Sequence, residues 1–234
     1  MFKTLADAFK VKEVRNKIIL TLVLLFIYRL GCWLPIPGID TEALGVKVEG
    51  NTFLSLLSAV SGGALSQGSF LALGVSPYIT SSIIMQLMTI AIPKLEEMQK
   101  DGEQGRKKIA SITRYVTVGL ALIESAAMAI GFGRSGLLQE YNAINVIIVV
   151  AAMTAGSAVV MWIGERITDY GVSNGISMLI FAGIVARGPA EVGNFIAYLK
   201  DGTTVQKIMV PVIIIIFILM VGFVVFMNHA ERII

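Results

Sequence analysis

Long apolar segments separated by short polar stretches run through most of the sequence. The hydrocarbon core of a bilayer needs about 20 apolar residues per helix, and five segments reach or approach that length. They are residues 18–37, 74–92, 115–132, 144–163 and 208–227. A further apolar segment, residues 176–186, is short and needs its flanks to cross, and the charged stretch 94–114 is predicted to be a loop. The pattern therefore predicts an all-α integral membrane protein, built as a polytopic bundle of helices.

The segment of residues 53–92 departs from this regular pattern. Its first part is moderately apolar and is interrupted by "SGGALSQGS", and its second part contains Gly74 and Pro77 followed by several hydroxyl residues. Non-helical backbone at membrane depth is tolerated only where it is buried in protein or lines a watery cavity. A half-helix outside, a glycine-rich break and a returning helix therefore indicate a pore or a binding site. Close helix–helix packing through small residues is the alternative.

Composition and charge support the membrane class and give an orientation. Hydrophobic residues make up 56% of the chain and charged residues 15%, against about 25% charged residues in soluble domains. With six crossings, 13 Lys and Arg residues lie on the side of the N-terminus and 5 on the other, leaving out Arg29 inside the first span. Because cytoplasmic loops carry the excess of these residues, we expect a cytoplasmic N-terminus. Residues 1–17 are amphipathic and can lie on the membrane surface.

Two charged side chains lie within the expected spans. Glu124 is near the middle of its span, where a carboxyl group needs a partner, water or a proton. We expect it to join a polar cluster between helices, with Thr80, Ser81 and Gln86 as candidate partners. A proton-relay site, as in ion-coupled transporters, is the alternative. Arg29 either extends its side chain to the outer interface or pairs with an acid.

The sequence offers little for catalysis or metal binding. His229 is the only histidine and Cys32 the only cysteine, so a site with several His ligands, a disulfide within the chain and a Ser–His–Asp set are excluded. The glycine-containing segments also lack the Lys and the spacing of a phosphate loop. We therefore expect no catalytic residue, no metal and no cofactor.

Two segments identify a family. "SFLALGVSPYITSSIIMQLM", residues 69–88, and "WIGERITDYGVSNGISMLI", residues 162–180, resemble the two signatures of the SecY family of protein-conducting channels. The resemblance covers essentially the whole chain. It implies the N-terminal half of an inverted pseudo-symmetric ten-helix channel, residues 18–207, followed by a sixth span and a truncated cytoplasmic end, residues 208–234. We expect either a piece of a longer channel or a half-channel that must dimerise to form a pore.

The resemblance also implies three sets of site residues. The first is an apolar ring that closes the pore: Val75, Ile79, Ile176 and Ile180. The second is a plug at about residues 57–69, centred on Ser61, Gly62, Gly63, Ala64, Leu65 and Ser66. The third is a polar cluster at a lateral gate, formed by Thr80 and Glu124. Without the resemblance, the four ring residues are equally well explained as core packing.

The function implied by the resemblance is passage of unfolded polypeptide across the bacterial cytoplasmic membrane, with lateral release of apolar segments into lipid. The implied partners are the SecE and SecG subunits, the SecA motor ATPase, the ribosome, preproteins with signal sequences, and the lipid bilayer. Apart from the ribosome, we expect no bound nucleic acid. Two other functions remain open: an ion-coupled secondary transporter with Glu124 as its proton site, and a structural membrane subunit without a pore.

Overall fold

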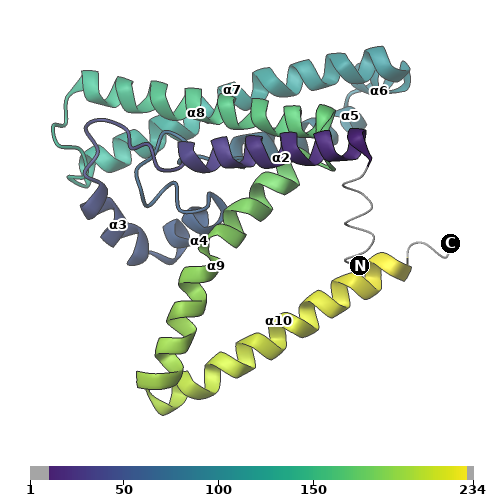
Figure 1. Ribbon diagram of the computed structural model, residues 1–234. Coiled ribbons are helices and arrows are strands. Elements are labelled where there is room, and N and C mark those ends of the chain that lie inside the picture. Colours follow the sequence, from purple (N-terminus) through teal and green to yellow (C-terminus); the bar gives the residue numbers. More distant parts are fainter. Residues whose placement is uncertain (1–10, 231–234) are drawn as a thin grey trace. The chain divides into compact units, whose positions relative to one another are not determined.

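The computed structural model describes residues 11–230, and the described part is helical apart from its loops and two isolated β-bridges (Figure 1). The chain divides into two compact units, Met1–Ala186 and Arg187–Ile234. The helices of the first unit are α2 (Lys12–Gly31), α3 (Thr41–Glu49), α4 (Thr52–Val60), α5 (Ser76–Ala91), α6 (Pro93–Lys100), α7 (Gly102–Arg134) and α8 (Ala143–Tyr170). Helix α9 (Gly175–Asp201) begins in the first unit and ends in the second, which also contains α10 (Thr204–Ala230).

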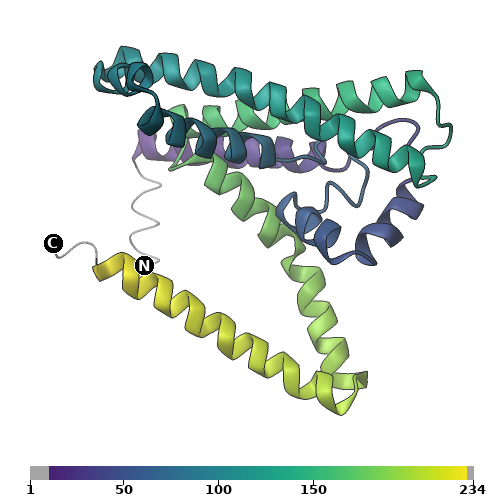
Figure 2. The same cartoon turned by 180° about the vertical axis from the view of Figure 1, so that it is seen from behind.

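Four long helices form the centre of the first unit. Helix α7 packs against both α5 and α8, and α8 packs against α2 (Figures 1 and 2). Small residues permit these close approaches. At Gly156 of α8, an added Cβ would lie 1.8 Å from the carbonyl oxygen of Phe70. The segment that precedes α5 therefore packs directly on the backbone of α8, as helices and loops in membrane proteins do at glycine.

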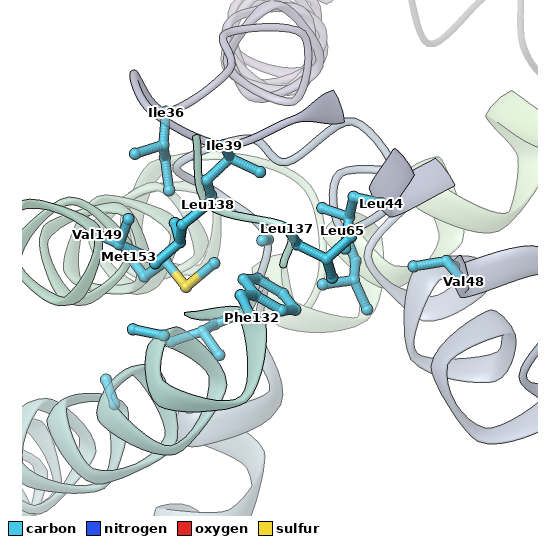
Figure 3. Close-up of a cluster of buried hydrophobic side chains, with 14 residues drawn as sticks. Ile36, Ile39, Leu44, Val48, Leu65, Phe132, Leu137, Leu138, Val149 and Met153 are labelled. Atoms are coloured by element: carbon cyan, nitrogen blue, oxygen red, sulfur yellow. The ribbon is translucent and has the colours of Figure 1, made fainter. Parts of the chain in front are cut away.

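Two clusters of buried apolar side chains hold the first unit together. The first joins α3, α7, α8 and the loop between α7 and α8, with Phe132 and Met153 at its centre (Figure 3). The second joins α2, α8 and the first turns of α9, through Tyr28, Ile163 and Leu179 among others. Helices α3 and α4 begin at the caps Asp40 and Asn51, whose side chains accept hydrogen bonds from the first free backbone N–H groups.

The expected spans and the observed helices agree in position but differ at their ends. The helix expected at 18–37 is α2, Lys12–Gly31, because the chain turns before its two prolines. The short apolar segment 176–186 belongs to the 27-residue helix α9. The charged stretch 94–114, expected as a loop, forms α6 and the first turns of α7. Of the amphipathic segment 1–17, residues 1–10 lie outside the described part.

Four helices of the described part are long and apolar enough to cross a membrane: α7, α8, α9 and α10. Helices α5 and α6 meet at a bend of 100° and would supply a fifth span if counted together. Helix α2 is more charged than these, since it starts among basic residues and carries Arg29 in its last turn. The expectation of six crossings stays a prediction.

Candidate functional site

The candidate plug consists of a helix followed by an irregular loop. We expected a half-helix centred on "SGGALSQGS", but the helical part is α4, Thr52–Val60, and residues 61–75 form consecutive turns. Gly62 and Gly74 have φ angles of +67° and +56°, which side chains other than glycine rarely adopt. The glycines that suggested a break in a helix therefore shape a compact loop.

Backbone carbonyl groups of this loop bind the end of α2. The guanidinium group of Arg29 donates a hydrogen bond to the carbonyl oxygen of Gly62. The hydroxyl group of Tyr28 lies 3.5 Å from the carbonyl oxygen of Ser61, and the sulfur of Cys32 lies 4.0 Å from the same oxygen. Arg29 thus has a main-chain partner, which neither sequence-based explanation of its charge had included.

Two apolar residues of the candidate plug each belong to one of the two apolar clusters. Leu65 belongs to the first cluster and Ala64 to the second, and both are fully buried. Ser66 donates a hydrogen bond of 2.8 Å to the carbonyl oxygen of Gly63. The loop is therefore a well-packed part of the first unit, with its own internal hydrogen bonds.

The four predicted ring residues lie in one cluster. Val75 is buried within the second apolar cluster, and Ile79, Ile176 and Ile180 are partly buried against it. In each helix the two residues are one turn apart, which places them on one face. The structure therefore brings together side chains from α9 and from the start of α5, more than 90 residues apart in the sequence. Their role in closing a pore stays a prediction, because ordinary packing uses the same contacts.

A cavity of about 500 Å³ joins members of all three predicted sets. Its lining includes Val75 and Ile79 of the ring, Ser61 and Leu65 of the plug, and Thr80 and Glu124 of the gate. Apolar residues of α4 and α7 complete the wall: Phe53, Leu57, Val60, Ala127 and Met128. The result is a largely apolar chamber that contains a single carboxyl group.

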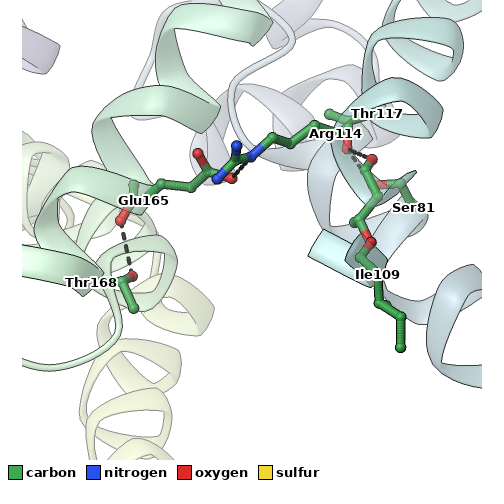
Figure 4. Close-up of polar contacts among 8 residues, drawn as sticks. Ser81, Ile109, Arg114, Thr117, Glu165 and Thr168 are labelled. Carbon is green, nitrogen blue, oxygen red and sulfur yellow. Dashed lines mark hydrogen bonds and ion pairs between the residues drawn. The ribbon is translucent and has the colours of Figure 1, made fainter. Parts of the chain in front are cut away.

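Thr80 and Glu124 share this chamber, but no direct hydrogen bond joins them in the described structure. Thr80 donates to the carbonyl oxygen of Ser76 in its own helix, at 3.1 Å. Ser81, a second candidate partner of Glu124, is fully buried and shares a hydrogen bond with Thr117 of α7 (Figure 4). Hydrogen bonds between hydroxyl groups thus join α5 to α7, and Glu124 is left half-buried at the cavity.

The ion pair of the bundle was also missed by sequence reasoning. Arg114 of α7 and Glu165 of α8 form an ion pair of 2.7 Å, which Figure 4 shows bridging the two helices. The sequence did contain a signal for this pair. Arg114 directly precedes one expected span and Glu165 follows the next, and these two span ends are predicted to lie on the same side of the membrane. Next to it, the guanidinium group of Arg166 lies 5.6 Å from the ring centre of Trp162 and 5.4 Å from that of Tyr170, within the range of cation–π attraction.

Among the side chains that the structure describes, no group of three or more His, Cys, Asp or Glu residues is placed to hold a metal ion. The candidate site consists of an apolar chamber, a loop of turns bound through its backbone, and one carboxyl group.

Sequence comparison places this chain among known proteins. The family model described as SecY matches residues 69–234. Protein translocase subunit SecY of Bacillus licheniformis is 40% identical over 240 residues, which cover 99% of this chain and 56% of that protein. The SecY subunit of Pseudomonas aeruginosa is 42% identical over 210 residues, covering 89% of this chain and 47% of that protein. The chain thus spans about half the length of these relatives.

Solved structures show the same fold at lower sequence identity. The structure of a protein-conducting channel matches with a TM-score of 0.50 and 20% identity, covering 82% of this chain and 40% of that one. A structure of the SecY protein, whose plug domain stabilises the closed state of the translocation channel, matches with a TM-score of 0.51 and 19% identity, covering 83% and 39%. The part of this chain that matches therefore has the fold of part of such a channel.

Proposed function

This chain belongs to the SecY family, and we propose that it is a subunit of a channel that passes unfolded polypeptide across the cytoplasmic membrane and releases apolar segments sideways into lipid. Because it spans about half the length of its relatives, the activity of a complete channel is part of this proposal. The transported chain keeps its covalent bonds, so the protein acts as a gated passage and not as an enzyme.

The observation that carries the proposal is the cavity of about 500 Å³ that is lined by members of the ring, the plug and the gate together. A pore needs an apolar constriction, an element that blocks it and an opening toward lipid, and the candidates for all three meet here.

The apolar ring explains how a passage can be tight and yet not retain its substrate. Branched apolar side chains exclude water and ions from a narrow opening, since a hydrophobic constriction of this kind dewets. They also offer no hydrogen-bonding groups that would hold a passing polypeptide. We assign this role to Val75 and Ile79 at the start of α5, with Ile176 and Ile180 of α9 opposite them.

The loop after α4 is proposed as the plug that blocks this passage at rest. Ala64 and Leu65 anchor it in the two apolar clusters, and its turns can rearrange without breaking a long helix. The solved SecY structure with a similar fold offers a parallel, because its plug domain stabilises the closed state of that channel.

The lateral gate is proposed at the side of the cavity where Thr80 and Glu124 lie. An apolar segment that enters there exchanges contact with the chamber wall for contact with lipid, at little cost in hydrophobic free energy. A signal sequence would open the gate by binding the open state better than the closed one.

Placement and partners follow from the same proposal. The chain is a multi-pass membrane protein, and we assign its N-terminus to the cytoplasm on the distribution of Lys and Arg. The proposed partners are SecE, SecG, SecA, the ribosome and preproteins with signal sequences. Sec61 in the canine ribosome–channel complex is a structural neighbour with a TM-score of 0.50, which supports the ribosome among them.

Loss of the seal tests the ring. In the full-length protein assembled in lipid vesicles, Ile79→Ser together with Ile180→Ser should raise the resting ion leak about tenfold or more, because polar side chains wet the constriction. The measurement is ion flux across the vesicle membrane without any polypeptide substrate.

The matched control is Ile83→Ser, one turn further along α5, where the side chain is 52% exposed and lies outside the cavity lining. This variant should leave the leak at the wild-type level. An unchanged leak in the ring variant would contradict the channel and favour a membrane subunit without a pore.

A further inference from the structure

We propose that Arg29 of α2 and Gly183 of α9 clamp the turn at Gly62 and thereby hold the plug closed. This inference rests on the proposed function, since it gives a task to the loop identified there as the plug. It assigns Arg29 as a positioning residue, which acts through the plug backbone and contacts no transported chain. We call the three residues Arg29, Gly62 and Gly183 the clamp.

The contact from α2 is a hydrogen bond between a charged donor and a backbone acceptor. Arg29 is half-buried and donates to the carbonyl oxygen of Gly62, which is itself buried. A buried carbonyl group needs a partner, and hydrogen bonds to charged groups are stronger than neutral ones. Arg29 therefore stabilises the closed loop.

The contact from α9 depends on two glycines. An added Cβ on Gly62 would lie 2.9 Å from the Cα atom of Gly183 and 2.9 Å from the Nη1 atom of Arg29. An added Cβ on Gly183 would lie 3.1 Å from the carbonyl oxygen of Val60 and 3.3 Å from the backbone nitrogen of Gly62. All four distances are shorter than an ordinary van der Waals contact. The backbone of α9 thus touches the plug turn because neither residue carries a side chain.

The position of Gly183 on α9 connects the plug to the ring. Ile176, Ile180 and Gly183 are spaced i, i+4 and i+7, so they lie along one stripe of the helix. The two isoleucines are proposed ring residues, and Gly183 is the next position of that stripe. Any movement of α9 that withdraws the isoleucines also withdraws the surface against which Gly62 packs. The clamp therefore makes opening of the ring and release of the plug one event.

Thiol labelling can measure how often the plug leaves its site. In a Cys32→Ala background, Ala64→Cys places a thiol at a fully buried position of the plug loop, so it reacts only after the loop is displaced. Full-length protein in lipid nanodiscs is treated with a water-soluble maleimide, which then has access from both membrane faces. Arg29→Met and Gly183→Ala should each raise the labelling rate about tenfold or more, which corresponds to about 1.4 kcal/mol or more.

Conservative and control variants separate the clamp from a general loss of stability. Arg29→Lys keeps the charge but not the planar donor geometry and should give an intermediate rate. Arg134→Met, at the exposed end of α7, and Gly119→Ala, at a site where an added Cβ meets nothing within 4 Å, should label like wild type. A thiol introduced by Ser157→Cys, buried in α8, should stay protected in every variant, because only global unfolding exposes it.

Wild-type labelling rates in both Arg29→Met and Gly183→Ala would overturn the clamp, and so would equal increases at the plug and at the α8 thiol. The ion-leak measurement on the ring variant tests the channel separately. Faster plug labelling without a leak from that variant would support the clamp and contradict the channel. A leak with unchanged plug labelling would contradict the clamp alone.

Discussion

Pairs of hydroxyl groups join the long helices of the first unit, in addition to the ion pair between α7 and α8. Ser81 binds Thr117 across α5 and α7, and Ser125 binds Thr154 across α7 and α8 at 2.9 Å. Each hydroxyl also lies within hydrogen-bond distance of a carbonyl group of its own helix. Since a hydroxyl has one hydrogen, one member of each pair donates to the other, which donates to its own helix, and the pair needs no water. The sequence showed polar residues in apolar helices but left Ser81 among the candidate partners of Glu124, because the partner across a helix pair depends on its rotation.

Glu124 distinguishes a channel from an ion-coupled transporter. Glu124→Gln keeps the size and the hydrogen-bonding capacity of the side chain but removes proton exchange. We expect polypeptide transport to persist within about tenfold of wild type, a change below about 1.4 kcal/mol, with a shifted balance of closed and open states. The measurement is the rate of polypeptide transport into vesicles between pH 6 and pH 8.

The exposed Glu140 in the loop after α7 supplies the control, since Glu140→Gln should change neither the rate nor its pH dependence. Complete loss of transport in Glu124→Gln, together with loss of any dependence on a proton gradient, would identify Glu124 as a relay and reject the channel.

At the scale of helices, hydropathy located the long apolar helices but not where they end. Ion pairs of the i, i+4 type, Glu96 with Lys100 and Glu103 with Lys107, favour helix in the charged stretch that was expected as a loop. The candidate plug shows the opposite difference. Its glycine-rich part was expected to be helical, but it forms turns after the short helix α4. The i, i+4 spacing of charges therefore predicts helix where average polarity alone suggests a loop. The path of the loop after α4, in contrast, depends on its tertiary contacts with α2 and α9.

Close packing of α8 on the segment before α5 gives a prediction with a matched pair of glycines. Gly156→Ala places a Cβ 1.8 Å from the carbonyl oxygen of Phe70, so we expect it to lower the free energy of unfolding by about 1–3 kcal/mol or to prevent folding. Gly119→Ala, in α7, meets open space and should be neutral or stabilising by up to about 1 kcal/mol. Thermal unfolding in detergent micelles, followed by helical circular dichroism, measures both.

The two substitutions have the same chemistry and lie within long helices, so any difference between them reports packing. If the melting temperatures of both variants shift equally, the contact between Phe70 and α8 is not as the structure has it.

For the molecule as a whole, the sequence predicted the all-helical class, and the match to the SecY family model and the similar solved structures confirm it. The three sets of site residues came from the family resemblance and not from periodicity, which left pore and packing both open. The shared cavity and the bond from Arg29 to the plug turn could not be predicted from one sequence. Both depend on where α2 and α4 pack, and their apolar faces alone do not specify this.

Orientation in the membrane is a prediction at this scale. In a Cys32→Ala background, Gln104→Cys lies at the exposed start of α7, and Ser135→Cys lies directly after its end. With a cytoplasmic N-terminus, a membrane-impermeant maleimide added outside intact spheroplasts should label Ser135→Cys and leave Gln104→Cys unlabelled. Permeabilised cells provide the control, in which both thiols should react.

Labelling of Gln104→Cys in intact cells with protection of Ser135→Cys would reverse the orientation. It would also place the ion pair between Arg114 and Glu165 on the outer side of the membrane.

The sharp bend between α5 and α6 links this protein to the thickness of its membrane. Helix α5 has 16 residues and is therefore about 24 Å long, shorter than the hydrocarbon core of about 30 Å. The 100° turn into the polar helix α6 prevents it from extending further in that direction. Where α5 faces lipid, its length is matched by local thinning of the bilayer, by flanking side chains that reach the interface or by contacts with other helices, at a cost that grows with the length of the acyl chains. Lipid composition thus acts on the same wall that carries Val75 and Ile79, and lipids with longer acyl chains would strain the wall even when no substrate is present.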